Sequence, residues 1–439
     1  MKRINFFIVV CAIFYMLTNL YAFEDLSLAQ STISGDPALG VTTSSSTFET
    51  ALAVTASIPE AANVLVLSTF SLESSKTKST YMSWELTYGG QASLTMQRYL
   101  SATSDAGSAS AAHLFTSIPS GNQTFNLDFA SSTSEALILF GANLCAIPMV
   151  TDQGSIMSSS MASIIAESAV SVTNYTDVGL VSTVSVDRVA NDNSIFMAAA
   201  INSSSNGDAV EGMWRLEIRS IGGTWADTGV ETRRNLSGSN DQGAISLFGL
   251  APNLTNGKYE IRVTARSLAT GVTVNTLSST LATFSLSYTN STASGYFPAK
   301  MDSASQSTNS ATTWAPIPGL NSELSHTSSV NAFAALSMGG STQTGANQTG
   351  HFRISCTNNT GFVQQSVGVE RFFTGSDDWG SMGVVSIFTN ITAGTTSFIG
   401  EQERSQGATL TDYPVITSFL TSSSEISFPK RGTVHIFDY

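Results

Sequence analysis

The chain has 439 residues and a net charge of −13, only 12% of its residues are charged, and serine and threonine together make up about a quarter of it. Its acidic surplus repels nucleic-acid phosphates and anionic lipids, which excludes nucleic acid as a partner. A hydrophobic content of 42% is too high for a disordered chain, so the composition predicts packed domains with a surface of hydroxyl and amide groups.

The first 22 residues have the pattern of a secretory signal peptide. Lys2 and Arg3 precede an apolar run over 6–17, and a cleavage position follows at Ala22. The run is shorter than the roughly 20 apolar residues that span a bilayer. We therefore expect an extracellular or cell-surface protein with no transmembrane span after cleavage, and the alternative is an uncleaved anchor. Loss of 1–22 leaves 17 basic and 32 acidic residues, a net charge of −15.

One sparse pattern recurs three times at intervals of 130 and 138 residues, which indicates tandem copies of one domain type. In each copy an asparagine opens an apolar run, a large aromatic follows 21 residues later, and an arginine comes next. An aspartate lies seven residues after the arginine, and a glycine lies two beyond it. These positions are Asn63, Trp84, Arg98, Asp105 and Gly107; Asn193, Trp214, Arg234, Asp241 and Gly243; and Asn331, Phe352, Arg371, Asp378 and Gly380.

Short segments rich in Val, Ile, Leu, Thr, Phe and Tyr alternate with turn residues at roughly the 8–12-residue spacing of a β-sandwich. They predict an all-β chain of three tandem antiparallel β-sandwich domains in a row, of Ig-like or jelly-roll-like topology. Residues 156–170 fit a short helix or a linking strand, and the prolines of 291–325 favour an extended connector. The expected divisions are a signal peptide at 1–22, an N-terminal extension at 23–46, sandwiches at 47–150, 176–290 and 326–439, and linkers at 151–175 and 291–325, with an extra strand at the C-terminus.

The repeated arginine, aspartate and glycine predict a tight loop between two strands. Thr103, Ser239 and Ser376 lie two residues before each aspartate, and such side chains accept bonds from nearby backbone N–H groups. The glycine would supply a positive φ, and the arginine would pair with the aspartate across the loop. The pattern resembles the Asp-box turn of sialidase-like propellers over five residues per copy. That turn is a structural element, and this chain lacks both its following aromatic and the short propeller repeat, so the resemblance implies no activity.

The repeated aromatics Trp84, Trp214 and Phe352 alternate with charged residues, which predicts that they point into the domain cores. The unrepeated tryptophans Trp225, Trp314 and Trp379 are better candidates for exposed contacts. Cys145 and Cys356 occupy non-equivalent strands, and we expect buried free thiols, with a bridge between domains or subunits as the alternative.

No catalytic, metal or cofactor site is predicted, and we expect a protein that is not an enzyme. The four histidines lack paired ligand spacing, and neither a nucleophile elbow nor a phosphate-binding glycine loop occurs. Asp377 and Asp378 could suit calcium, but the other copies carry one aspartate there. Glycosylation is permitted at nine Asn-x-Ser/Thr positions: Asn122, Asn174, Asn202, Asn235, Asn253, Asn290, Asn347, Asn358 and Asn390.

Secretion, tandem repetition and low surface charge together predict a self-assembling structural protein. We expect a subunit of an extracellular filament, sheath or surface layer that forms a homopolymer. Its terminal segments 23–46 and 432–439 could add as strands to a neighbouring copy, or pair within their own domains. The alternative function is an adhesin or carbohydrate-binding protein that stacks cell-surface glycans on Trp225 or Trp379, and a third is a secreted hydrolase.

Overall fold

The computed structural model describes residues 28–58, 60–74, 79–101, 105–133, 135–149, 158–186, 192–238, 241–288, 299–303, 307–309, 312–326, 329–342, 348–374, 378–404 and 410–422. Within these ranges every regular element is a β-strand except the 3-10 helix η1 (Pro37–Leu39). The all-β prediction is confirmed. No helix in the described part is long and apolar enough to cross a membrane. The predicted signal peptide and the segment 432–439 lie outside the described residues.

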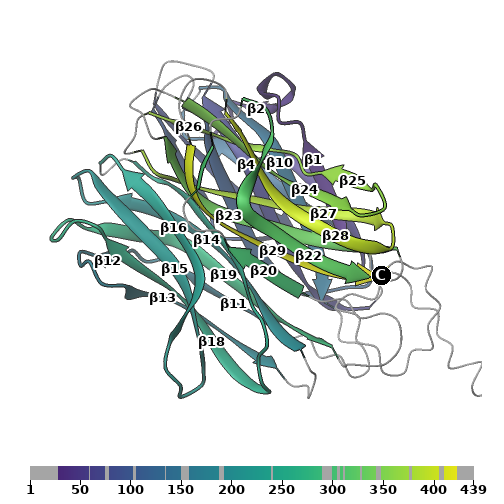
Figure 1. The fold of residues 1–439 in the computed structure, drawn as a ribbon. Coiled ribbons are helices and arrows are strands. Elements are labelled where there is room, and N and C mark those ends of the chain that lie inside the picture. Colours follow the sequence, from purple (N-terminus) through teal and green to yellow (C-terminus); the bar gives the residue numbers. More distant parts are fainter. Residues whose placement is uncertain are drawn as a thin grey trace, which may run out of the picture.

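Two kinds of strand build each domain, and their burial patterns tell them apart. Strand β5 (Thr80–Tyr88) alternates buried and half-buried residues, as expected for a sheet with one face in water. Strand β17 (Gly243–Ala251) is buried at all nine positions, because protein covers both of its faces. We call the first kind of sheet outer and the second kind inner, and each domain has one of each (Figure 1).

The strands divide among six sheets as follows. The first domain has the inner sheet β1 (Ala29–Ile33), β2 (Val41–Thr43), β10 (Leu137–Met149), β4 (Ala62–Ser74) and β8 (Gly107–Ile118), and the outer sheet β3 (Glu49–Ile58), β9 (Gly121–Ser131), β5, β6 (Gln91–Ala92) and β7 (Met96–Leu100). The second has the inner sheet β11 (Ser159–Ile164), β12 (Ser168–Val170), β19 (Val274–Tyr288), β14 (Asp192–Ser205) and β17, and the outer sheet β13 (Thr176–Val186), β18 (Gly257–Ser267), β15 (Val210–Ser220) and β16 (Ala226–Leu236). The third has the inner sheet β20 (Ala299–Ser303), β21 (Ser307–Asn309), β29 (Leu410–Ser422), β23 (Val330–Thr342) and β27 (Gly380–Ile391), and the outer sheet β22 (Ala315–His326), β28 (Gly394–Arg404), β24 (Gln348–Asn358), β25 (Val363–Gln365) and β26 (Val369–Phe373).

Strand order identifies the topology that the sequence left open. The inner sheet of the first domain runs β1-β10-β4-β8 and the outer sheet runs β3-β9-β5 with β7 beside β5. Counting β1 and β2 as one strand and leaving out the short β6, these orders are 1-8-3-6 and 2-7-4-5 in an eight-strand domain. This interleaving of two antiparallel sheets is the jelly roll. The second and third domains repeat both orders, so each copy of the sequence pattern is one jelly roll.

Several segments predicted to connect or extend the domains are instead part of their sheets. Strands β11 and β12 occupy the predicted linker 151–175 and pair with β19. In the predicted connector 291–325, β20 and β21 pair with β29, and most of β22 pairs with β28. The predicted extension 23–46 contributes β1 and β2, which pair with β10 of their own domain. The two linker assignments were wrong because these edge strands are largely polar and so read as loops, whereas the alternative that 23–46 pairs within its own domain is confirmed for β1 and β2.

The three domains close into a ring in which the edge strand of each inner sheet packs on the inner sheet of the next domain. Three contacts show this arrangement, each between a side-chain hydroxyl and the backbone of an edge strand. Thr280 Oγ1 of β19 donates to the Ala112 carbonyl of β8 at 2.8 Å, Ser337 Oγ of β23 donates to the Ser246 carbonyl of β17 at 2.7 Å, and Val385 N–H of β27 donates to Thr69 Oγ1 of β4 at 3.1 Å. The prediction of three tandem β-sandwich domains is confirmed, and their arrangement in space is a closed ring.

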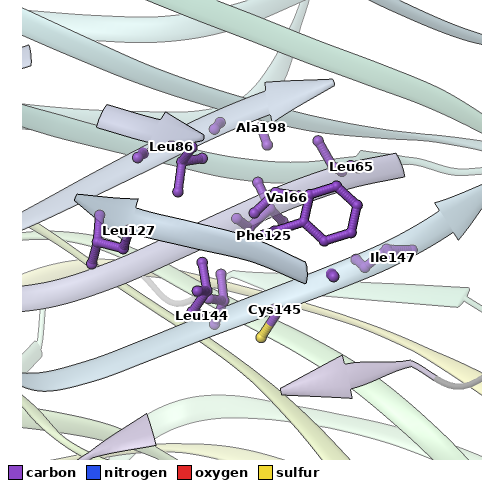
Figure 2. Packing of buried hydrophobic residues seen from close by; sticks show 14 of the residues in the cluster. Leu65, Val66, Leu86, Phe125, Leu127, Leu144, Cys145, Ile147 and Ala198 are labelled. Carbon is purple, nitrogen blue, oxygen red and sulfur yellow. The ribbon is translucent and has the colours of Figure 1, made fainter. Parts of the chain in front are cut away.

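Apolar side chains make the ring one body. Phe196 of the second domain packs edge to face on Phe333 of the third, with 5.6 Å between ring centroids. Ala198 belongs to the same buried cluster as Leu65 of the first domain, and Figure 2 shows both in one packed region. Because each inner sheet is covered on both faces, its strands carry small and hydroxyl residues where an outer strand carries charged ones.

The repeated asparagine bonds the turn at the end of the edge strand, through its Oδ1 in the first and third copies and through Asn193 Nδ2, which donates to the Leu254 carbonyl at 3.2 Å, in the second. Asn63 Oδ1 accepts the N–H of Ser117 at 3.1 Å, and Asn331 Oδ1 accepts that of Asn390 at 3.0 Å. Ser117, Asn253 and Asn390 are the non-glycine residues of the described chain with positive φ, at 57°, 57° and 55°. In the first and third copies the side-chain bond to the N–H of this positive-φ residue offsets the cost of the left-handed conformation.

Candidate functional site: the arginine and aspartate axis

The repeated arginines pair with the aspartates of their own copies. Arg98 Nη2 lies 3.5 Å from Asp105 Oδ1, and Arg371 Nη2 lies 3.2 Å from Asp378 Oδ1. Arg234 forms the same contact with Asp241. Arg98, Arg234 and Arg371 are only 4%, 2% and 4% exposed, so the pairs are structural elements of the interior.

Each aspartate also closes its loop through a hydroxyl residue that the sequence analysis missed. Asp105 Oδ2 accepts the N–H of Ser101 at 2.9 Å and its hydroxyl at 3.0 Å. Ser237 and Thr374 make the same two bonds to Asp241 and Asp378. These residues lie three positions after each arginine, and that spacing was the available signal. The predicted partners Thr103, Ser239 and Ser376 lie outside the described residues.

The repeated glycine is required by space and not by a positive φ. None of Gly107, Gly243 and Gly380 has a positive φ, in contrast to the prediction. A Cβ atom at Gly107 would lie 2.0 Å from Cζ of Arg98, and one at Gly380 would lie 1.6 Å from Nε of Arg371. The guanidinium group lies flat against the start of each edge strand, where only a hydrogen atom fits.

Equivalent backbone bonds join the three loops around one axis. The N–H of the residue after each arginine donates to the carbonyl of the residue after an aspartate in the next domain. The bonds are Tyr99 to Gln242 at 2.9 Å, Asn235 to Trp379 at 2.8 Å, and Phe372 to Ala106 at 2.8 Å. The first domain bonds to the second, the second to the third and the third to the first. The three ion pairs, one from each domain, are therefore arranged around a pseudo-threefold axis.

Burial and neighbouring charges shift the pKa values on this axis. Burial lowers the pKa of Arg98 to about 10, and the positive charge of Arg371 adds to the shift. Burial acts to raise the pKa of Asp241, but the charges of Arg234 and Arg98 and the bonds from Ser237 outweigh it and lower that pKa. Asp241 is thus held between arginines of two domains.

Replacing Gly380 with alanine should destabilise the ring by about 1–3 kcal/mol, because the new Cβ overlaps the Arg371 guanidinium and forces it off its aspartate. Urea unfolding of the purified chain measures the effect. The control is Gly35→Ala, whose Cβ would meet no atom closer than 3.5 Å. Equal stability of the two variants would contradict this role for the glycine.

The repeated aromatics occupy the domain cores. Trp84, Trp214 and Phe352 are at most 1% exposed. Trp84 Nε1 donates to the Ser110 carbonyl at 3.1 Å, and Trp214 Nε1 donates to Thr276 Oγ1 at 3.0 Å. Sugar stacking on these rings is excluded by their burial.

The unrepeated tryptophans stack on arginines. Trp225 is half-buried, and the guanidinium carbons of Arg219 and Arg262 lie 4.3 and 4.1 Å from its ring centroid. Trp379 is 8% exposed and packs under Arg233 of the second domain, so the prediction of an exposed contact there is wrong. Its neighbour Asp378 pairs with Arg371, and no group of residues suited to a metal ion occurs in the described chain.

A further repeated aromatic escaped the sequence pattern because its spacing varies between copies. Phe48, Tyr175 and Trp314 each directly precede the first outer strand of a domain. Arg215 lies over Tyr175 at 3.8 Å, and Arg353 lies over Trp314 at 4.1 Å. In the first copy Glu85 occupies the position equivalent to Arg215 and Arg353, and Phe48 is 39% exposed.

The two cysteines are buried free thiols, as expected. Burial raises the pKa of Cys145, and it raises that of Cys356 to about 12. The thiolate is the reactive form, so the raised pKa values keep both thiols protonated near neutral pH.

The asparagines of the glycosylation sequence differ in accessibility. Asn202 is 4% exposed, so burial excludes a glycan there in the folded chain. Asn235 and Asn358 are half-buried, and the Asn358 amide donates to the Thr392 carbonyl at 2.7 Å. Asn290 and Asn347 lie outside the described residues. The exposed positions are Asn122, Asn174, Asn253 and Asn390.

An open groove of about 590 Å³ lies where the third domain meets the first. Strand β1, Thr55, the segment 364–367 and residues of β27 line it. Gln30 Oε1 accepts the N–H of Ile387 at 2.6 Å, and Gln364 bonds both backbone groups of Thr389. The described residues that line it include no acid, base or thiol, so they offer contact surface and no proton-transfer group.

Glu370 is a buried carboxyl group at this same interface. Its N–H donates to Ser71 Oγ of the first domain at 2.6 Å, and its carboxylate lies 3.5 Å from Nδ1 of His351. Burial, with a smaller effect from Glu73, raises the pKa of Glu370 to about 7. A raised carboxyl pKa adds stability below the unfolded-state value of 4.5, and this contribution is lost as the pH rises through 7.

Glu370→Gln should therefore raise the free energy of unfolding by about 2 kcal/mol at pH 8 relative to the original chain, and by much less at pH 5. Because His351, whose pKa is lowered by burial, lies 3.5 Å from Glu370, the comparison is repeated in a His351→Gln background to remove its contribution. Urea titrations at the two pH values make the comparison. Exposed Glu323 of the same domain supplies the control Glu323→Gln. A difference that does not change with pH would contradict the assignment.

Comparison with known proteins gives no family. No family model matches the chain, and no curated protein is similar in sequence. Among solved structures, the tandem CBM22 domains of Paenibacillus barcinonensis Xyn10C align over 61% of this chain and 94% of theirs, with 10% identity and a TM-score of 0.17. PNGase F, a glycosylasparaginase from Flavobacterium meningosepticum, aligns over 60% and 93%, with 10% identity and a TM-score of 0.25. The triple jelly-roll protein of an archaeal virus aligns over 91% and 97%, with 10% identity and a TM-score of 0.17.

Proposed function

We propose that the chain is an exported, non-enzymatic structural protein, and that its closed ring is the subunit of an extracellular filament, sheath or surface layer. The observation that carries the proposal is the cycle of three interdomain backbone bonds around the buried ion pairs. The repeated arginines and aspartates hold the loops that close the ring. The motif therefore favours a rigid subunit. Fixed geometry is what a repeating assembly requires of its subunit.

Two exposed apolar side chains supply candidate contacts with a second copy. Leu39, in the loop between β1 and β2, is 66% exposed, and Ile165, in the equivalent loop between β11 and β12, is 77% exposed. Strand register places the two loops at one end of the ring. In the first domain Val41, Leu139, Leu72 and Gly107 lie in one row across the sheet, and in the second Ser168, Thr276, Ser203 and Gly243 do.

The fold reduces the number of terminal segments that could add as strands to a neighbouring copy. Strands β1 and β2 pair within their own domain, so this part of 23–46 is not a free strand. The segment 432–439 stays a prediction. Contacts through the apolar loops are the better supported route.

Electron microscopy of the purified, signal-free chain tests the proposal. The original chain should form filaments or layers, and the double variant Leu39→Ser, Ile165→Ser should remain dispersed with an unchanged unfolding midpoint. Val363→Ser is the control, because Val363 is 61% exposed but lies at the opposite end of its sheet from the Arg371 loop. A chain that stays monomeric across concentration, pH and salt would overturn the proposal.

A further inference from the structure

Several buried hydrogen-bond donors of the three repeated arginines have no acceptor among the described residues. Nε and Nη1 of Arg98, Nε and Nη1 of Arg371, and Nε of Arg234 are buried and have no acceptor among the described residues. A buried donor without an acceptor is destabilising, and more so when the group is charged. Five such groups within one cluster point to an acceptor that the described residues do not supply.

Four of the five donors without an acceptor belong to Arg98 and Arg371. Arg234 Nη1 donates to the Ser203 hydroxyl at 3.0 Å and to the carbonyls of Ser203 and Asp241 at 3.3 and 3.4 Å. Ser203 lies opposite Gly243 in the sheet. The residues that lie opposite Gly107 and Gly380 are Leu72 and Gly340, which have no hydroxyl. Arg98 and Arg371 therefore lack the acceptor that Arg234 has.

These two guanidinium groups belong to adjacent loops at the contact between the third domain and the first. Phe372, the residue after Arg371, bonds to Ala106, the residue after Asp105. Among the charged neighbours of Arg98, Arg371 has the largest effect on the Arg98 pKa, larger than that of Asp105 or Arg234. Two guanidinium groups in adjacent loops, each with buried donors that have no acceptor among the described residues, favour an anion between them.

We propose that a monovalent anion, with chloride as its simplest form, binds at the ring axis, between the guanidinium groups of Arg98 and Arg371. The three arginines are already balanced by three aspartates, so a single negative charge disturbs the cluster less than a dianion does. Gly107 and Gly380 hold the two guanidinium groups in place at the starts of the edge strands, because a Cβ atom there would overlap Arg98 or Arg371.

Halide dependence of stability tests the site. Thermal unfolding of the purified chain is followed in sodium chloride and in sodium gluconate at equal ionic strength, since a bound ligand raises the midpoint in a saturable way. The midpoint should rise by several degrees with chloride and then level off. Arg98→Lys and Arg371→Lys should abolish this rise, whereas Arg234→Lys should keep it, because Arg234 has its own acceptors.

Bromide-soaked crystals of the original chain provide a second test that does not depend on the variants folding. An anomalous peak between Arg98 and Arg371 is the expected result. A midpoint equal in chloride and gluconate, together with no anomalous peak at the axis, would overturn the site. Loss of the chloride effect in Arg234→Lys alone would overturn its placement. None of these outcomes depends on whether the ring assembles into filaments.

Discussion

Asp241→Asn should lower the free energy of unfolding by about 3 kcal/mol, because removing one partner of a buried ion pair leaves the other charge uncompensated. The charge left behind is that of Arg234, which is 2% exposed. Asp241 also lies beside Arg98 of the first domain, so the substitution weakens the contact between two domains. Chemical denaturation followed by tryptophan fluorescence measures the loss.

The matched control is Asp227→Asn. Asp227 pairs with Arg215 at 3.1 Å on the outer sheet of the same domain, and its side chain is 48% exposed. Exposed pairs of this kind contribute about 0–1 kcal/mol. The pKa of Asp241 is lowered in the folded chain, so its stabilisation is present above pH 3.8 and should fade below it. Similar losses for both variants would mean that the axis has no special role.

Trp214→Ala should cost about 3–5 kcal/mol, the range for deleting a large aromatic from a packed core. Trp214 is fully buried, and its indole N–H donates to Thr276. Trp225→Ala should cost about 1 kcal/mol, since it removes only stacking on Arg219 and Arg262 at a half-buried site. Urea midpoints of the two variants give the comparison. A larger loss at Trp225 would contradict the division between core and surface tryptophans.

The domain count and the core aromatics were predictable because they depend on side-chain chemistry at fixed spacing. A core position in a jelly roll needs a large apolar group, and Trp84, Trp214 and Phe352 meet that need at the same step in each copy. The outer strands were predictable for a similar reason. One face of an outer sheet is exposed to water and the other is buried, so polar and apolar residues alternate along each strand.

The ring was not predictable because its contacts depend little on which residue types make them. The closing bonds join backbone groups, so their donors can be residues as different as Tyr99, Asn235 and Phe372. Strands buried on both faces, such as β17 with its glycines and alanines, lack the alternation that marks a strand. The glycine beside each arginine was assigned to a turn, because sequence does not show that a guanidinium group from another strand lies against it.

The same reasoning explains the missed edge strands. Strand β11 reads Ser-Ser-Met-Ala-Ser-Ile, a polar run without clear alternation. It is held by backbone pairing with β19, and by Met161, whose sulfur accepts the N–H of Leu114 in the first domain at 3.3 Å. Both depend on the neighbouring strand and domain, which no local pattern reveals.

Small-angle X-ray scattering of the purified, signal-free chain tests the closed ring most directly, at concentrations where the chain is dispersed. A compact body of this size should have a radius of gyration of roughly 22 Å and a pair-distance distribution with a single peak. Three jelly rolls joined in a row would give a markedly larger radius and an extended tail at long distances. That elongated profile would contradict the ring and the role of the arginine and aspartate pairs in closing it.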